Sequence, residues 1–313
     1  MDIGIDVGGT NLKAGVVDEQ GTILAAVRRP LGTVSGPEPF VRTLVDLTEA
    51  AAAEAGASLA QIRSVGIGIP GAAEEGRIVY TCNIPLKDVP VEKLFHRQIP
   101  VPVLLGNDAD CAAVGEYFCG TGRGTRNFVT VTLGTGIGGG LILGGRLYRG
   151  LGMAGEIGHM VIDRSGPLCS CGRRGCWETY ASATGLIRMT REAMDRDPDS
   201  LLHRTAAENG AVDGRTAFQA AQLGDPAAQE VCQKYVAALA EGITNLVNLL
   251  HPEKLAIGGG VSAAPEELLL FPLREQVERA CYARHGGRMT RIERAALGND
   301  AGLIGAALLR KAI

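Results

Sequence analysis

Apolar runs separated by glycine-rich turns occur twice along the chain. Residues 2–29 read as three consecutive strands joined by tight turns, and residues 127–149 repeat this pattern. Residues 39–57 instead place apolar side chains at every third or fourth position, which is typical of an amphipathic helix. Strands that alternate with helices indicate an α/β protein. The repeated three-strand pattern indicates two related domains with a cleft between them.

The rest of the chain continues the alternation of strands and helices. Further strands are expected at 64–69, 101–105 and 254–257, and further helices at 109–117, from about 178 onward, at 226–250 and at 301–311. Residues 191–214 are polar and weakly patterned, which favours an excursion at the surface.

Composition and charge narrow the classes of protein. With 313 residues, the chain is long enough for two domains with a full core each. The net charge of −3 and the lack of a basic run argue against nucleic acid or an anionic membrane as the main partner. No apolar stretch reaches the ~20 residues of a membrane span, and the N-terminus enters a strand without a leader pattern. We therefore expect a cytoplasmic protein.

Each copy of the three-strand pattern contains a glycine turn suited to phosphate. The first turn is DVGGT at 6–10 and the second is LGTG at 133–136. Glycine lets backbone N–H groups approach a phosphate without a Cβ in the way. The candidate phosphate donors are Gly8, Gly9, Thr10, Thr135 and Gly136. Asp6 could orient a metal-bound water, and Lys13 could neutralise charge. The two glycine turns together suggest a kinase-like site that binds the phosphates of a nucleotide.

A third glycine cluster follows the strand expected at 254–257. Gly259 and Gly260 suit close backbone approach to a nucleotide base or ribose. The alternative is a plain strand-to-helix turn, just as the first glycine turn taken alone could be a simple hairpin.

Asn107 and Asp108 stand between a strand and a helix of small residues. An Asp at this place is often only an N-cap, which stabilises a helix by ~1 kcal/mol. The functional interpretation is a base that accepts a hydroxyl proton while the oxygen attacks phosphorus, where positioning carries most of the catalysis. One residue can do both.

A histidine and three closely spaced cysteines form the sharpest local signal. The candidate metal ligands are His159, Cys169, Cys171 and Cys176. One imidazole and three thiolates complete a tetrahedral zinc site of the structural kind, with no open position for catalysis. Glu156 and Glu178 flank this cluster, and their carboxylates could accept hydrogen bonds from the adjacent hydroxyls of a polyol. The other five cysteines are expected to be buried thiols: Cys82, Cys111, Cys119, Cys232 and Cys281.

Taken together, these motifs resemble the ROK family (repressors, open reading frames, sugar kinases) over essentially the whole chain. The resemblance rests on DVGGT at 6–10, ND at 107–108, LGTG at 133–136, ExGH at 156–159 and CxCGxxGCxE at 169–178. The zinc motif is highly specific for the family, whereas the glycine turns are shared with the wider actin and hexokinase group of ATPases. Within the family, ETYASATG at 178–185 is most similar to the bacterial glucokinases.

The resemblance implies a two-lobed actin-like (ribonuclease H-like) ATPase fold with a duplicated β-sheet core and an interlobe cleft. The small N-terminal lobe would comprise residues 1–108 plus about 299–313. The large lobe would comprise residues 109–298 and carry the zinc-binding loop at 159–176.

The resemblance also implies an activity, which is transfer of the γ-phosphate of ATP to the 6-hydroxyl of D-glucose. Asp108 would be the catalytic base. The implied substrate ligands are Gly71, Asn83, Asn107, Asp108, Glu156, His159 and Glu178. Structural Zn²⁺ would stiffen the loop that presents the sugar ligands, and Mg²⁺ would come with ATP, held by phosphates, waters and Asp6. Members of the family are commonly homodimers or homotetramers.

Alternatives stay open at this point. Within the family, the substrate could be N-acetylglucosamine, N-acetylmannosamine or fructose, with the preference set around residues 81–86, and polyphosphate could replace ATP. A non-catalytic sugar sensor or repressor belongs to a different class. The sequence disfavours that class because Asp108 and both glycine turns are present.

Overall fold

Two five-stranded sheets form the framework of the protein, whose structure is a computed structural model that describes all residues, 1–313. The first sheet contains, in spatial order, β3 (Ile23–Pro30), β2 (Asn11–Val17), β1 (Asp2–Val7), β4 (Val65–Ile69) and β8 (Val103–Asn107). The second contains β11 (Arg146–Leu147), β10 (Ile137–Leu143), β9 (Phe128–Leu133), β12 (Lys254–Gly258) and β13 (Arg291–Arg294). A small third sheet contains β5 (Gly71–Glu74), β6 (Arg77–Thr81) and β7 (Lys87–Val89).

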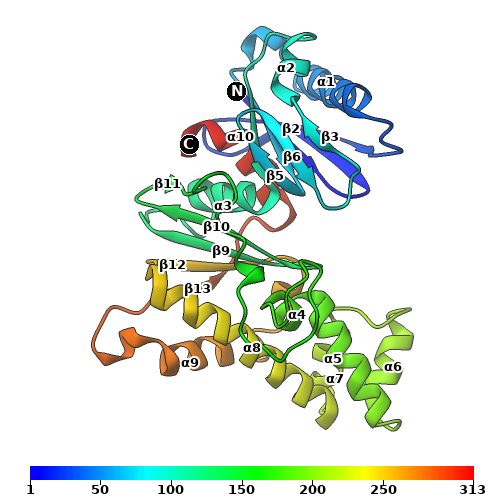
Figure 1. The fold of residues 1–313 in the computed structure, drawn as a ribbon, viewed down its shortest axis with the longest axis vertical. Helices are drawn as coiled ribbons and strands as arrows, with labels where there is room; N and C mark the ends of the chain where they lie inside the picture. Colours follow the sequence, from blue (N-terminus) through cyan, green and yellow to red (C-terminus); the bar gives the residue numbers. More distant parts are fainter. The chain divides into compact units, whose positions relative to one another are not determined.

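The two large sheets share one topology (Figure 1). Each begins with a meander of three consecutive strands, in which β1 pairs with β2 and β10 pairs with β11 in antiparallel fashion. Each ends with parallel strands, β4 beside β8 and β12 beside β13. The predicted α/β class and the predicted duplication of the sheet core are therefore confirmed.

Ten α-helices connect and cover these sheets. They are α1 (Pro37–Glu54), α2 (Val91–His96), α3 (Asp108–Cys119), α4 (Glu178–Ala181), α5 (Ala183–Arg196), α6 (Leu201–Glu208), α7 (Thr216–Gln222), α8 (Pro226–Leu250), α9 (Leu270–Ala280) and α10 (Ala301–Ala312). Short 3-10 helices are η1 (Leu59–Gln61), η2 (Ile157–His159), η3 (Gly260–Ala263), η4 (Tyr282–His285) and η5 (Gly298–Asp300).

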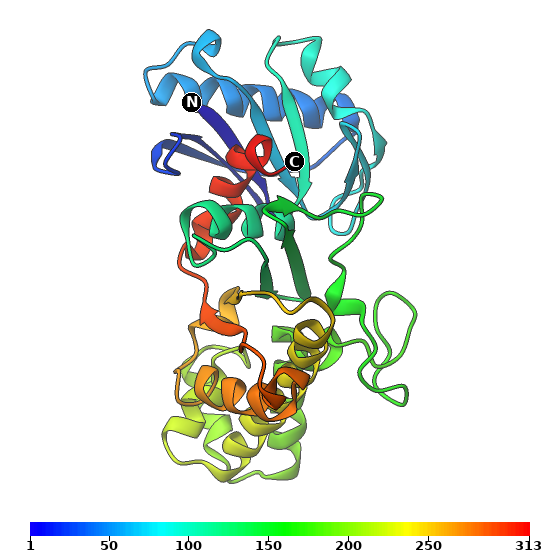
Figure 2. The ribbon, with the colours of Figure 1, turned by 90° about the vertical axis from the view of Figure 1, so that its left-hand side faces the viewer.

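The chain folds into two compact units. The first unit comprises Met1–Thr130, Gly140–Gly155 and Ala296–Ile313, and the second comprises Val131–Gly139 and Glu156–Ala295. The first unit therefore extends past residue 108, where the sequence predicts the end of the small lobe; that lobe boundary stays a prediction. Both ends of the chain belong to the first unit (Figure 2).

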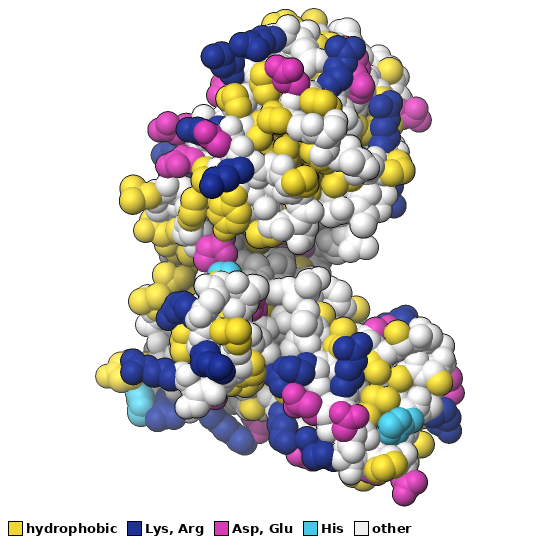
Figure 3. All heavy atoms as spheres, turned by 45° about the vertical axis from the view of Figure 1, so that its right-hand side comes forward, with side chains coloured by type: hydrophobic (Ala, Val, Ile, Leu, Met, Phe, Trp, Pro, Cys, Tyr) yellow, Lys and Arg dark blue, Asp and Glu magenta, His cyan; other side chains and the backbone are white.

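The surface shows no large field of one charge on the face drawn in Figure 3, where basic and acidic side chains are interspersed. None of the helices combines the length and the apolar composition that crossing a bilayer would require.

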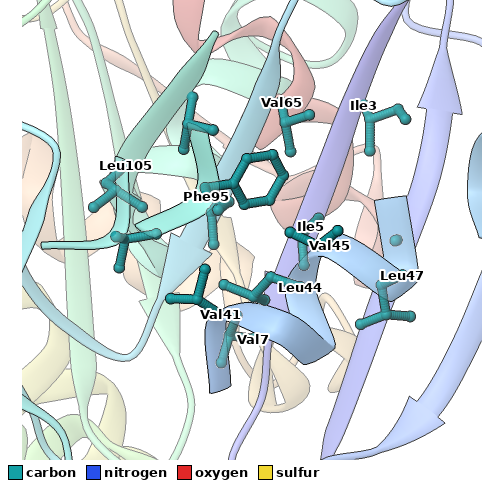
Figure 4. Close-up of a cluster of buried hydrophobic side chains, with 14 of the residues drawn as sticks. Ile3, Ile5, Val7, Val41, Leu44, Val45, Leu47, Val65, Phe95 and Leu105 are labelled. Carbon is teal, nitrogen blue, oxygen red and sulfur yellow. The ribbon is translucent and has the colours of Figure 1, made fainter. Parts of the chain in front are cut away.

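The core of the first unit lies between its sheet and α1. Ile3, Ile5 and Val7 alternate along β1 and are almost completely buried. They belong to one buried cluster with Val41 and Leu44 from the apolar face of α1 (Figure 4). Alternation along the strand then turns Gly4 and Asp6 toward the opposite face of the sheet.

That opposite face holds α10 at very short range. A Cβ on Gly4 would lie 2.0 Å from the carbonyl oxygen of Leu303, and one on Gly66 would lie 1.7 Å from that of Ala306. Any side chain at either glycine would push the helix off the sheet. The two glycines therefore allow α10 to lie directly on β1 and β4, which brings its N-terminal end to the first glycine turn.

The second unit is built around α8. Its first residues, Asp225 and Pro226, are an N-cap and a proline at the first helical position, and Asp225 accepts a hydrogen bond from the Ala228 amide. The helix ends where His251 adopts the left-handed conformation at φ 42°. The helix predicted from about 226 to 250 is therefore confirmed.

The structure departs from three local expectations, in part or in full. Residues 191–214 form the end of α5 and all of α6, whose Leu202 is fully buried, because a few apolar positions suffice to dock a short helix. The helix expected from 178 is interrupted at Ser182, whose hydroxyl instead caps α5 by accepting from the Gly185 amide. Cys82 is exposed and Cys119 is half-buried, whereas both were expected to be buried thiols.

Candidate functional site

The first glycine turn joins β1 and β2 in the first unit. The Gly8 amide donates to the carbonyl of Asn11 at 2.9 Å and closes the turn. Gly9 and Thr10 are exposed at its tip. A Cβ on Gly9 would lie 3.9 Å from the Cβ of Asn83, so a predicted phosphate donor and a predicted sugar ligand are neighbours.

Asp6 and Lys13 face each other across the β1–β2 pair. Burial raises the pKa of Asp6 above its ordinary value, and the positive charge of Lys13 lowers it in part. Lys13 also forms an ion pair with Asp300, just before α10, and a Cβ on Gly302 would lie 3.5 Å from Asp6 Cγ. Asp300 thus joins this charged group; its only sequence signal is its place just ahead of the last helix.

Asn107 and Asp108 stand where β8 leads into α3. Asn107, rather than Asp108, is the N-cap: its Oδ1 accepts from the Ala109 amide at 2.8 Å. The Nδ2 of Asn107 donates to the carbonyl of Gly71 at 3.0 Å and ties β8 to the start of β5. Asp108 is the first helical residue, and its exposed side chain also accepts from Ala109.

The second glycine turn joins β9 and β10 and is fixed by the start of α5. The amide of Gly134 donates to the carbonyl of Gly136 at 3.0 Å, and the amide of Ala183 donates to Gly134 at 2.8 Å. The Thr184 hydroxyl donates to the carbonyl of Thr135 at 2.7 Å. Thr135 itself is exposed, so the turn is held from behind while its outer edge stays open.

Two other predicted site residues of the second unit border this turn. A Cβ on Gly136 would lie 2.6 Å from Glu178 Oε2. Gly259 follows β12 with φ +82°, and a Cβ there would lie 2.5 Å from the carbonyl oxygen of Leu133. Gly260 is exposed with open space around its α-carbon. The second unit thus places a candidate sugar ligand and both remaining glycine motifs around one turn.

The histidine and cysteine side chains converge as the sequence predicts. One ligand atom from each of His159, Cys169, Cys171 and Cys176 lies within 4.8 Å of those of all the others. The distance is 3.6 Å both between Cys171 Sγ and Cys176 Sγ and between Cys169 Sγ and His159 Nδ1. The edges of a tetrahedral zinc site with thiolate and imidazole ligands measure about 3.5–3.8 Å. The cluster can therefore hold a tetrahedral metal ion.

The loop around this cluster is shaped by two glycines. Gly172 and Gly175 adopt positive φ angles of 86° and 70°, which L side chains rarely adopt. A Cβ on Gly175 would in addition lie 1.4 Å from the carbonyl oxygen of Asp163. Burial raises the pKa of the Cys169 thiol to about 12, with its contact to Glu178 adding to the rise, whereas a bound cation would favour the thiolate.

Glu178 links the metal cluster to the second glycine turn. Its Oε1 lies 3.0 Å from Cys169 Sγ and 3.7 Å from His159 Nδ1. Because His159 presents Nδ1 to the cluster, its Nε2 is left for a contact outside the four candidate metal ligands. Glu156, by contrast, precedes η2 with an exposed side chain.

Trp177 anchors Glu178 from behind. This single tryptophan of the chain is fully buried, and its Nε1 donates to the carbonyl of Ala238 on α8 at 2.9 Å. A Cβ on Gly242 would lie 2.1 Å from the indole ring, so the helix has room for the ring only because it has glycine there. The contact escaped the sequence analysis because it joins residues 61 positions apart.

The predicted site residues thus form two groups, one in each unit. The first unit holds Asp6, Gly8, Gly9, Thr10, Lys13, Gly71, Asn83, Asn107 and Asp108. The second unit holds Thr135, Gly136, Glu156, His159, Cys169, Cys171, Cys176, Glu178, Gly259 and Gly260.

Comparison with known proteins places this geometry in a family. The chain is 37% identical over 314 residues to a glucokinase of Halalkalibacterium halodurans, covering 99% of this chain and 94% of that protein. Its structure matches a ROK family glucokinase of Streptomyces griseus in complex with glucose and AMPPNP, with a TM-score of 0.81, 34% identity and 99% coverage of both chains. It also matches the ROK hexokinase of Thermus thermophilus, with a TM-score of 0.82, 35% identity and coverage of 98% and 97%.

The match to these structures confirms the predicted actin-like ATPase fold. At the level of sequence, the ROK family matches residues 2–313. The chain therefore belongs to the ROK family.

Proposed function

We propose that the protein is an ATP-dependent glucokinase that phosphorylates the 6-hydroxyl of D-glucose. The observation that carries the proposal is the contact between Glu178, a candidate sugar ligand, and Gly136, a candidate phosphate ligand. A protein that binds a hexose and ATP phosphates side by side is suited to phosphoryl transfer. The glucokinase relative and the solved glucokinase with glucose and AMPPNP support the choice of glucose and ATP.

Asp108 is the proposed catalytic base. Its carboxylate is exposed at the start of α3 and accepts the proton of the sugar 6-hydroxyl as that oxygen attacks the γ-phosphorus. The transferred phosphoryl group carries most of the developing charge, so the base chiefly positions the hydroxyl and removes its proton late. Asn107 keeps the helix start fixed through its bonds to Ala109 and Gly71.

The other hydroxyl groups of the sugar would be held by polar groups of the chain. The proposed ligands are Gly71, Asn83, Asn107, Glu156, His159 and Glu178. Carboxylates accept two hydrogen bonds from neighbouring hydroxyls, which distinguishes a pyranose from water by geometry. His159 would contribute Nε2, since its Nδ1 faces the cysteines.

The nucleotide would be held mainly by backbone groups of the glycine turns, with Lys13 neutralising charge. The proposed ligands are Gly8, Gly9, Thr10, Lys13, Thr135 and Gly136 for the phosphates and Gly259 and Gly260 for the nucleoside. Mg²⁺ bound to ATP keeps several waters, and Asp6 would orient them from the end of β1. The raised pKa of Asp6 would fall on binding, because the cation favours the ionised carboxylate.

The metal cluster would hold structural Zn²⁺. Four protein ligands with thiolate and imidazole donors fit zinc, which would supply cross-linking of the loop and no open position for substrate. His159, Cys169, Cys171 and Cys176 would fix the loop that leads to Glu178. We further propose a homodimer or homotetramer and a cleft between lobes of 1–108 plus about 299–313 and of 109–298.

A substrate panel tests the proposed function. ADP release from Mg-ATP is coupled to a dehydrogenase and measured with glucose, N-acetylglucosamine, N-acetylmannosamine, fructose, mannose and allose, and then with polyphosphate in place of ATP. A selective signal with glucose and ATP is expected. Preference for an N-acetyl sugar or fructose would change the substrate, and no turnover with any sugar would favour a sensor.

A further inference from the structure

Arg149 connects three elements of the first unit that bracket the proposed base. It lies in the segment after β11, and its half-buried guanidinium donates from Nη2 to the carbonyl of Ala73 on β5 at 2.6 Å. Nη1 donates to the carbonyl of Leu105 on β8 at 3.3 Å. Its Nε lies 3.5 Å from Oδ2 of Asp110, a carboxylate that is only 3% exposed in the first turn of α3.

Each of these three contacts is two residues from a proposed site residue. Ala73 follows Gly71 by two positions, Leu105 precedes Asn107 by two, and Asp110 follows Asp108 by two. On β8, residues two apart point the same way, so fixing the Leu105 carbonyl helps to fix the direction of Asn107. On β5 the register shifts between Ala72 and Ala73, so Arg149 holds the strand at Ala73 beside this irregularity. The amide of Asn107 bonded to the Gly71 carbonyl forms a second, parallel tie between the same two strands.

A planar guanidinium suits this task better than an ammonium. Its donors form a rigid fork, so it holds two carbonyls on adjacent segments at one fixed spacing. Nη1 and Nη2 of Arg149 donate to backbone carbonyls, and its buried Nε forms an ion pair with Asp110 but no hydrogen bond, so the guanidinium is directed at the framework of the first unit. It therefore acts on the site through the segments that it joins.

We propose that Arg149 is a positioning residue for the transfer reaction, which holds the β5 start, the β8 end and the first turn of α3 in the arrangement that aims Asp108 at the sugar hydroxyl. This inference rests on the proposed function. Misplacement of a reacting group by about 1 Å costs on the order of 10²-fold in rate. Loss of the guanidinium therefore slows the chemical step far more than it weakens ATP binding, because the glycine turns remain untouched.

A pocket beside Arg149 makes a chemical test possible. Its volume is about 290 Å³, and it is lined by Arg149, Ala73, Glu74, Glu75 and the turn at 150–152. The two carboxylates favour entry of a small cation. A guanidinium ion added to an Arg149→Ala variant can therefore reach the place that the side chain has left.

The experiment compares Arg149→Ala, Arg149→Lys and the exposed neighbour variant Arg146→Ala with the wild type. We expect kcat for glucose to fall about 10²-fold in Arg149→Ala, less in Arg149→Lys and not in Arg146→Ala. The KM for ATP stays unchanged, and calorimetry shows one glucose site per chain as in the wild type. Added guanidinium, at concentrations that do not unfold the protein, restores part of the rate.

Two results would overturn the inference. The first is a kcat of Arg149→Ala within twofold of the wild-type value. The second is a fall in kcat that is fully explained by a matching fall in the number of glucose sites per chain. Hydrogen exchange at residues 70–75 and 105–112 is measured in parallel and is expected to be faster in Arg149→Ala. This arm needs no turnover, so an inactive wild type would contradict the proposed function while unchanged exchange would contradict the role of Arg149.

Discussion

Gly136 and Glu178 are in direct contact: a Cβ on Gly136 would lie 2.6 Å from Glu178 Oε2. One residue belongs to a turn suited to phosphate and the other to a helix start beside the metal cluster. The Glu178 carboxylate can therefore occupy its position only because residue 136 has no side chain.

Gly136→Ala is expected to raise the KM for glucose about tenfold or more, because the methyl group displaces the carboxylate that accepts sugar hydroxyls. The KM for ATP also rises, since the same turn holds phosphate. Steady-state kinetics with each substrate varied in turn measure both effects. Gly214→Ala is the control, because its new Cβ would lie 3.6 Å from Val261, an ordinary contact. A glucose KM that Gly136→Ala leaves unchanged would contradict the role of Glu178.

Asp108→Asn is expected to lower kcat by about 10²–10⁴-fold and to leave glucose binding nearly intact, because the amide cannot accept the hydroxyl proton. Single-turnover kinetics measure the chemical step and calorimetry measures binding. The control is Asp199→Asn, an exposed change in the loop before α6. Turnover at the wild-type rate in Asp108→Asn would rule out its role as base.

Cys171→Ser is expected to remove about one metal ion per chain, because a tetrahedral site loses affinity with each missing thiolate. Elemental analysis of the purified protein measures this. The melting temperature should fall, and glucose should bind more weakly as the loop before Glu178 loses its cross-link. Cys82→Ser changes another exposed cysteine, outside the cluster, and should keep its metal. Full zinc in Cys171→Ser would disprove the site.

Asp225 links stability to pH. Desolvation of the buried carboxylate raises its pKa. The hydrogen bonds from the amides of Ala228 and Leu201 and from the hydroxyl of Ser200 lower the pKa by more, so that it lies below its ordinary value. The folded state therefore releases this proton more readily, so its stabilisation is present above pH ~4 and is lost as pH falls through the folded pKa. Asp225→Asn should lower the free energy of unfolding by about 1–2 kcal/mol at pH 7 and make it depend less steeply on pH in the acid range.

Urea unfolding between pH 7 and pH 3 checks this dependence. The matched control is Asp199→Asn, whose wild-type carboxylate is exposed. A variant at position 225 that loses stability with acid as steeply as the wild type would show that other carboxylates govern the acid limb.

Asp6 has the opposite effect on how stability depends on pH. Its pKa is raised in the folded state, so the folded chain binds more protons than the unfolded chain, and stability falls as pH rises through the folded pKa. Asp6→Asn should therefore melt at a higher temperature than the wild type at pH 7 without nucleotide, and should lose most of its turnover with Mg-ATP. Scanning calorimetry with and without Mg-ATP tests both. A lower melting temperature in the variant without nucleotide would contradict this account.

The sequence predicted the elements whose signals are local. The strand triplets are bounded by glycine turns, and α8 begins at Asp225-Pro226, so both were placed well. The four candidate metal ligands lie within 18 positions of one another, from 159 to 176, and the structure brings their ligand atoms together as the sequence predicts.

The contacts that depend on packing could not be predicted. Lys13 and Asp300 are 287 positions apart, and they meet only because glycines at positions 4 and 66 let α10 lie on the sheet. Arg149 lies in a segment without periodicity, where nothing in the sequence separates it from other surface arginines. The amphipathic pattern of α6 was too short to distinguish it from a polar loop.

The close packing of α10 on β1 and β4 has a consequence for folding during synthesis of the chain. β1 leaves the ribosome well before α10, so Asp6 and Lys13 can meet Gly302 and Asp300 only after the residues between them have been synthesised. Nascent chains cut before residue 301 would present the bare glycine face of this sheet to chaperones. Residues 156–295, by contrast, are contiguous and can begin to fold earlier. The half of the molecule that starts first is completed last.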